Sequence, residues 1–126
     1  MRAVDTNVLV RLVTRDDNRQ VASAETFTDK GAWVSHLVLA ETAWVLSAAY
    51  DLDHASIATA IDMLLNHITL TIQDADVVAA ALEHYRGKPA LGFSDCLVLE
   101  IARKAGHLPL GTFDKTLSKL GGAERL

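Results

Sequence analysis

Four acidic residues stand at positions where a carboxylate can do chemistry: Asp5, Glu41, Asp95 and Asp114. Two carboxylates about 4 Å apart repel by roughly 4 kcal/mol at an effective dielectric of 20, so a cluster of four needs a cation among them. Oxygen ligands without a neighbouring Cys or His favour Mg²⁺ or Mn²⁺ over Zn²⁺. Such an ion activates water and neutralises charge that develops on a phosphate. Together, the four acids therefore predict phosphodiester cleavage.

The three aspartates also have ordinary structural interpretations. Asp5 and Asp114 follow short apolar runs that are predicted to be strands, and in open parallel sheets ligands gather at the carboxyl ends of the strands. Either residue can instead serve as a turn residue or a helix cap, although Asn7 is predicted to cap the helix that follows Asp5. Asp95 begins a predicted helix, where the helix dipole alone favours a negative charge.

Glu41 is predicted to lie on an apolar face of a helix. At helical spacing it shares that face with Leu37, Trp44, Val45 and Ala48. Burying an unpaired carboxylate is costly, so such a group takes up a proton or finds a cation. No Lys or Arg lies between Gly31 and Tyr85. The alternative is a glutamate at the edge of the apolar face that reaches water or a distant arginine.

The elements that must position these acids alternate between strand and helix. Strands are predicted at residues 3–5, 33–34, 68–72 and 108–113, and helices at 8–13, 18–28, 37–50, 55–67, 75–86 and 94–106, with a short helix after Asp114. This alternation favours a parallel sheet that is covered on both faces. We therefore predict one α/β domain over residues 1–126, a three-layer α/β/α arrangement with a mostly parallel central sheet.

Length and composition are those of an ordinary globular domain: 126 residues, of which 50% are hydrophobic and 22% charged. The formal net charge of −4 argues against a protein that coats nucleic acid through bulk positive charge, but not against an enzyme that approaches it through a bound cation. The chain shows no signal peptide and no apolar run of about 18 residues. Its single cysteine, Cys96, cannot form an internal disulfide, so a cytoplasmic location without a membrane is expected.

The acids lie in short motifs that extend along the whole chain: Val4-Asp5-Thr6-Asn7, Val38-Leu39-Ala40-Glu41, Ser94-Asp95 and Gly111-Thr112-Phe113-Asp114-Lys115. In their order and context these motifs resemble those of PIN-domain ribonucleases, specifically the VapC-like toxins of bacterial type II toxin–antitoxin pairs. One departure is Cys96, where many relatives have a small residue such as alanine. A buried cysteine is nearly as small.

The resemblance implies an endoribonuclease that depends on Mg²⁺ or Mn²⁺ and hydrolyses RNA phosphodiester bonds with metal-activated water. Carried onto this chain, it makes Asp5 and Asp95 the main metal ligands. Glu41 then completes the site or positions the water, and Asp114 is the fourth acid.

The resemblance also implies residues and partners around these acids. Asn7 and Thr112 are expected to orient the carboxylates. A VapB-like antitoxin is expected to place a basic side chain in the acidic pocket, because Arg pairs well with carboxylates, and the chain is expected to form a homodimer. Candidates for contact with RNA, more often solvated surface charges, are Arg11, Arg15, Lys88 and Lys115.

Three alternative functions remain at this point. A phosphatase of the haloacid dehalogenase kind would use Asp5 as nucleophile, but it requires a second acid two positions later, where this chain has Asn7. A phosphoacceptor receiver domain would use Asp74 or Asp76 and leaves Glu41 unexplained. A PIN-like scaffold without catalysis is disfavoured because all four acids are present.

Other residues with chemical potential are expected to be structural. Trp33 and Trp44 can stack on bases, but their apolar neighbours favour packing in the core. Cys96 has no adjacent basic residue to activate a thiolate and is predicted to be buried. The five histidines show no metal-ligand spacing and are predicted at the surface or at helix ends.

Overall fold

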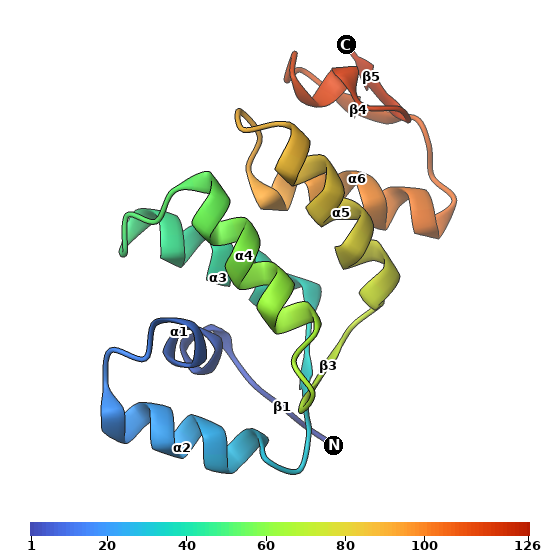
Figure 1. The fold of residues 1–126 in the computed structure, drawn as a ribbon. Helices are drawn as coiled ribbons and strands as arrows, with labels where there is room; N and C mark the ends of the chain where they lie inside the picture. Colours follow the sequence, from blue (N-terminus) through green and yellow to red (C-terminus); the bar gives the residue numbers. More distant parts are fainter. The chain divides into compact units, whose positions relative to one another are not determined.

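Helices and strands alternate along the chain, and all the strand pairs are parallel (Figure 1). The computed structural model describes residues 1–126 and divides into two compact units, Met1–Ala75 (unit 1) and Asp76–Leu126 (unit 2). The predicted α/β class with parallel strands, typical of a PIN-like α/β/α fold, is confirmed. None of the helices combines the length and the apolar character needed to cross a membrane.

Unit 1 is built on a three-stranded parallel sheet. In sheet order, its strands are β1 (Arg2–Ala3), β2 (Ala32–Val34) and β3 (Leu70–Ile72). Parallel neighbours need long crossover connections, and here each crossover contains two helices. The first contains α1 (Thr6–Thr14) and α2 (Asn18–Thr28), and the second contains α3 (His36–Ala48) and α4 (His54–Leu65).

A capping side chain precedes each of these four helices. The caps are Asp5, Asp17, Ser35 and Asp53, and each accepts a hydrogen bond from a backbone N–H in the first turn. Asp and Ser suit this position because their side chains satisfy an N–H group that has no partner within the helix. The predicted cap Ser35 is confirmed. The prediction that Asn7 caps α1 is wrong, because Asp5 occupies the cap and Asn7 lies within the first turn.

The core of unit 1 is formed by the facing sides of its helices and by β2. Its largest fully buried apolar side chains are Leu9, Val34, Leu39, Leu46, Ile61 and Leu64. Burial of one such side chain stabilises a fold by about 1.5–3 kcal/mol. These contacts hold α1 against both α2 and α3, and α3 against α4.

Unit 2 contains two helices followed by a small sheet. Its elements are α5 (Ala75–Gly87, whose first residue belongs to unit 1), α6 (Phe93–Ala105), β4 (Leu110–Thr112), the 3₁₀ helix η1 (Leu117–Lys119) and β5 (Ala123–Arg125). β4 pairs with β5 in parallel. The sequence predicts β4 and the short helix but not β5, because Ala-Glu-Arg has neither β-branched residues nor alternating polarity.

A buried carboxylate organises the interior of unit 2. Glu100 of α6 is 6% exposed and accepts hydrogen bonds from Arg103 Nε at 3.1 and 3.2 Å. Nε2 of His84, on α5, lies 3.0 Å from the same carboxylate. Arg103 also donates to the carbonyl oxygen of Gly121, just before β5. Glu100 and Arg103 therefore connect α5, α6 and the turn that leads into β5.

Candidate active site

The four predicted acids are divided equally between the two units. Asp5 and Glu41 belong to unit 1, and Asp95 and Asp114 belong to unit 2. Within either unit, no group of three or more His, Cys, Asp or Glu side chains is arranged to hold a metal ion. None of the four carboxylates takes part in an ion pair. By contrast, basic side chains pair with Asp16, Glu25, Asp76, Glu83 and Glu100.

Asp5 lies two residues beyond the end of β1 and caps α1. Its Oδ1 accepts a hydrogen bond from the backbone N–H of Val8 at 3.4 Å, and the side chain is exposed. The carboxylate therefore has a structural role, which the sequence analysis assigned to Asn7. It also lies at the carboxyl end of a parallel strand, where ligands gather in open sheets.

Glu41 lies on the exposed face of α3, so the prediction of a buried apolar face around it is wrong. On that face Leu37 is 68% and Trp44 is 69% exposed, which also overturns the predicted core position of Trp44. The buried face instead carries His36, Leu39, Thr42, Ala43 and Leu46. Apolar residues occur all around this helix, so spacing alone does not identify its buried side.

The contact made by Glu41 is with Thr6, the first residue of α1. Thr6 Oγ1 donates a hydrogen bond to Glu41 Oε2 at 3.2 Å. Asn7, to which the resemblance assigned an orienting role, lines a hollow between α1 and α2 together with Arg11 and Phe27. Sequence reasoning missed Thr6, although its position next to Asp5 placed it in the same helical turn.

Asp95 is the third residue of α6. Its Oδ2 accepts a hydrogen bond from the backbone N–H of Gly92 at 3.2 Å, which completes the start of the helix. The next residue, Cys96, is fully buried as predicted. Burial, and to a smaller extent the negative charges of Asp95 and Glu100, raise the pKa of its thiol to about 11. Cys96 therefore stays a protonated thiol at neutral pH and is not a nucleophile.

Asp114 follows β4 and begins the turn that leads into η1. Its Oδ1 accepts a hydrogen bond from the backbone N–H of Leu117 at 2.8 Å. Its own backbone N–H donates to Thr112 Oγ1 at 3.0 Å. Thr112 therefore contacts Asp114 directly, through the backbone of the acid.

All four acids share one arrangement, in which a neighbouring donor holds a single carboxylate oxygen. The donors are the backbone N–H groups of Val8, Gly92 and Leu117 and the hydroxyl of Thr6. A carboxylate offers about four lone-pair sites, so each acid keeps capacity to bind a cation. Carboxylate oxygens that are not paired with a basic side chain are suitable ligands for Mg²⁺ or Mn²⁺.

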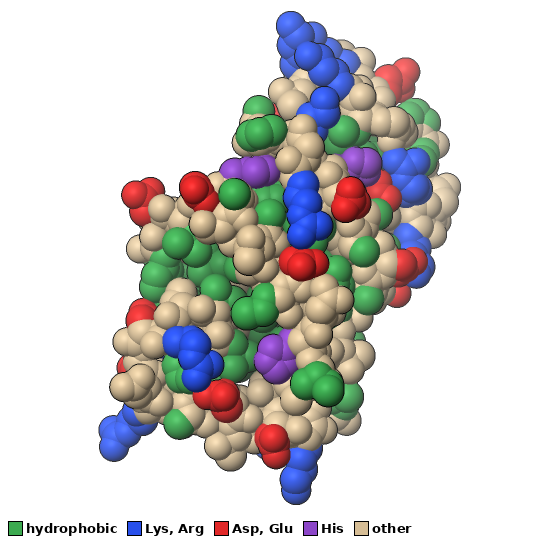
Figure 2. All heavy atoms as spheres, in the orientation of Figure 1, with side chains coloured by type: hydrophobic (Ala, Val, Ile, Leu, Met, Phe, Trp, Pro, Cys, Tyr) green, Lys and Arg blue, Asp and Glu red, His purple; other side chains and the backbone are tan.

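The four basic residues considered for RNA contact have different surroundings. Arg11 donates to Asp16 at 3.0 Å and to the Tyr50 hydroxyl at 2.9 Å, and Arg15 pairs with Glu25 at 3.1 Å. Lys88 and Lys115 make no ion pair. On the face drawn in Figure 2, Lys and Arg side chains gather over the segment that holds β4 and β5. The exposed residues Lys115, Lys119 and Arg125 belong to that segment.

Two further ring-bearing residues had predictions that the structure tests. His36 begins α3, which agrees with the prediction of a surface or helix-end position, but its side chain is only 9% exposed and its Nε2 has no hydrogen-bond partner. Its position at the start of α3 placed it on the buried side of a helix whose faces the sequence does not distinguish. Trp33, expected in the core, is 37% exposed because it occupies the middle position of β2, between two buried neighbours.

The PIN domain family model matches residues 2–123. The chain therefore belongs to the PIN domain family. No curated protein and no solved structure matched the chain. PIN domains are generally nucleases that act on nucleic acids with divalent metal ions, which defines this chain as a nuclease by class.

Proposed function

We propose that this PIN domain is an endoribonuclease that depends on Mg²⁺ or Mn²⁺ and acts as the VapC-like toxin of a toxin–antitoxin pair. The observation that carries the proposal is the set of four acids, in the order seen in such toxins, none of which is engaged by a basic side chain. The family match extends through both units, which supports residues 1–126 as one functional domain.

Each acid has a distinct part in the proposed reaction. Asp5 and Asp95 would be the main ligands of the metal ion, and Asp114 would add a further carboxylate. Glu41 would complete the site or position the attacking water. A bound divalent ion supplies a water of lowered pKa and offsets the negative charge that grows on the scissile phosphate. Thr112 fixes the backbone of Asp114 and thereby its carboxylate.

The proposed partners of this cytoplasmic enzyme follow from the same resemblance. A VapB-like antitoxin would place a basic side chain among the acids, and the unpaired carboxylates support that chemistry because Arg binds carboxylates in a fixed geometry. A homodimer is supported by the exposed apolar side chains of Leu37 and Trp44, which lie on one face of α3. Large apolar side chains that share an exposed face are typical of protein interaction surfaces.

Cleavage of a labelled RNA by the wild type and by Asp5→Ala tests the proposal in Mg²⁺, Mn²⁺ and EDTA. We expect cleavage by the wild type in either metal, no cleavage in EDTA, and at least about a hundredfold slower cleavage by Asp5→Ala, because the metal supplies several kcal/mol of transition-state stabilisation.

The matched control is Asp17→Ala. Asp17 caps α2 and accepts a hydrogen bond from the backbone N–H of Gln20 at 3.0 Å, so this variant also loses a capping carboxylate. We expect it to retain activity. Equal cleavage by the wild type and Asp5→Ala, or cleavage that persists in EDTA, would contradict the mechanism. Release of phosphate from a small ester would instead favour the phosphatase alternative.

A further inference from the structure

The first turn of α1 contacts both acids of unit 1. Asp5 caps the helix through the backbone N–H of Val8, and the next residue, Thr6, reaches Glu41 across the contact between α1 and α3. Asp5 and Glu41 are far apart in sequence, yet both accept hydrogen bonds from the first turn of α1, Asp5 from Val8 and Glu41 from Thr6. The local conformation at the start of α1 therefore affects both carboxylates.

Glu41 depends on this contact more than a buried glutamate would. Its side chain is exposed, and the Thr6 hydroxyl is the donor that its carboxylate accepts from. An exposed glutamate has several rotatable bonds and samples many conformations. Thr is stiff because its side chain branches at Cβ, so a hydrogen bond from Thr6 restricts where the Glu41 carboxylate lies.

The geometry of the bond leaves room for a cation. Thr6 Oγ1 donates to Oε2 at 3.2 Å, and a hydroxyl has one proton to donate. Oε1 and the remaining lone pair of Oε2 therefore stay available. A hydroxyl neighbour also adds no positive charge that would compete with a metal ion.

We infer that Thr6 is a positioning residue that holds Glu41 for metal binding. This inference rests on the proposed function, because it assigns Thr6 a role through an acid of the proposed metal site. Thr6 itself touches neither metal nor substrate in this role. The hydroxyl, rather than the methyl group, carries the effect, so Ser can replace Thr6 and Val cannot.

Binding of Mn²⁺ to the full chain tests the inference without measuring catalysis. Free Mn²⁺ is followed by its electron paramagnetic resonance signal during titration of the wild type, Thr6→Val and Thr6→Ser. We expect Thr6→Val to weaken Mn²⁺ affinity about tenfold, as is usual for residues that orient a ligand, and Thr6→Ser to bind like the wild type. The control is Thr59→Val, because Thr59 is exposed on α4 and its hydroxyl bonds the Ala55 carbonyl.

A double-mutant cycle with Glu41→Ala shows whether Thr6 acts through Glu41. We expect Thr6→Val to cause no further loss of Mn²⁺ affinity when Glu41 is already Ala. Suppose that Glu41→Ala weakens Mn²⁺ binding. The inference is then overturned if Thr6→Val binds Mn²⁺ like the wild type, or if Thr6→Val causes the same loss of affinity in the wild type and in Glu41→Ala. If Glu41→Ala itself binds Mn²⁺ like the wild type, the proposed metal site fails instead.

Thermal unfolding, followed by circular dichroism, separates positioning from a purely structural role. A residue that only joins α1 to α3 lowers the melting temperature when replaced but leaves Mn²⁺ affinity unchanged in the folded protein, and that result overturns the inference. If Thr6→Val does not fold, Thr6→Ala is compared with Thr6→Ser at the same position. The same difference in Mn²⁺ affinity is then expected.

Discussion

The two units of this PIN domain differ in charge. Unit 1 contains five Lys and Arg residues against ten Asp and Glu residues, whereas unit 2 contains seven against six. The overall charge of −4 therefore combines a unit with a charge of −5 and a unit with a charge of +1. The argument that an acidic chain repels nucleic acid applies to unit 1 and not to unit 2.

The units also differ in where their ionic networks lie. In unit 1, Arg11, Asp16 and Tyr50 form a partly exposed triangle of hydrogen bonds. In unit 2, the carboxylate of Glu100 is buried and lies within salt-bridge distance of Arg103 and His84. Exposed ion pairs add little stability, whereas charge-assisted hydrogen bonds to a buried carboxylate contribute about 1.5–3 kcal/mol each. We therefore expect charge changes to affect the stability of unit 2 more than that of unit 1.

The largest expected effect comes from removing the buried carboxylate. Glu100→Ala is expected to lower the free energy of unfolding by about 2 kcal/mol, because the buried carboxylate that joins His84 of α5 to Arg103 of α6 is lost. Asp16→Ala in unit 1 is expected to cost far less. Urea unfolding of both variants measures the difference, and equal losses would remove the distinction between the two networks.

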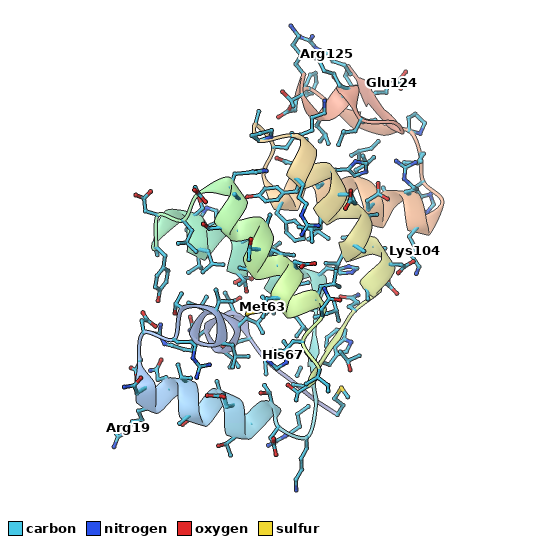
Figure 3. All side chains as sticks on the ribbon, in the orientation of Figure 1. Arg19, Met63, His67, Lys104, Glu124 and Arg125 are labelled. Atoms are coloured by element: carbon cyan, nitrogen blue, oxygen red, sulfur yellow. The ribbon has the colours of Figure 1, made fainter.

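A smaller effect is expected when an unpaired lysine of unit 2 is removed. Lys115→Ala should weaken binding of a single-stranded RNA and reduce the slope of log affinity against log salt concentration by about 0.7, the value for one phosphate contact. Fluorescence anisotropy in EDTA measures binding without cleavage. Arg19→Ala is the control in unit 1, since Arg19 is exposed and projects away from α2 (Figure 3). An unchanged slope for Lys115→Ala together with a reduced slope for Arg19→Ala would reverse the comparison.

The smallest expected effect is a pH dependence in unit 1. Hydrogen bonds from Thr14 and then Tyr50 lower the pKa of Asp16 below its ordinary value of 3.8. A lowered pKa stabilises the fold above the unfolded value, and this contribution is lost as the pH falls through 3.8 toward the folded value. The difference in unfolding free energy between the wild type and Asp16→Asn should therefore be larger at pH 6 than at pH 3. A difference that does not change with pH would count against the hydrogen bonds to Asp16.

Local chemistry in the sequence was enough to predict most of the fold. The bounds of α2 were predicted correctly, and Ser35 was identified as the cap of α3, because caps and helical spacing depend on neighbouring residues. The same reasoning wrongly chose Asn7 over Asp5 as the cap of α1, since both residue types cap helices well and residue type alone does not separate them.

The candidate site was only partly accessible to sequence reasoning. The four acids were identified from their motifs, and the family match supports the nuclease class to which those motifs pointed. The side of α3 that carries Glu41 was not predictable, because apolar residues surround the helix. The bond from Thr6 to Glu41 joins residues 35 positions apart, so it depends on how α1 packs against α3.

The exposed face of α3 has a practical consequence for spectroscopy. Trp44 is 69% exposed and lies about one helical turn from Glu41, with Leu37 one turn away on the other side. Any molecule that contacts both apolar side chains therefore also lies next to the carboxylate between them. The indole of Trp44 is thus a native fluorophore beside a candidate catalytic acid, and its emission should shift toward the blue when that face is covered.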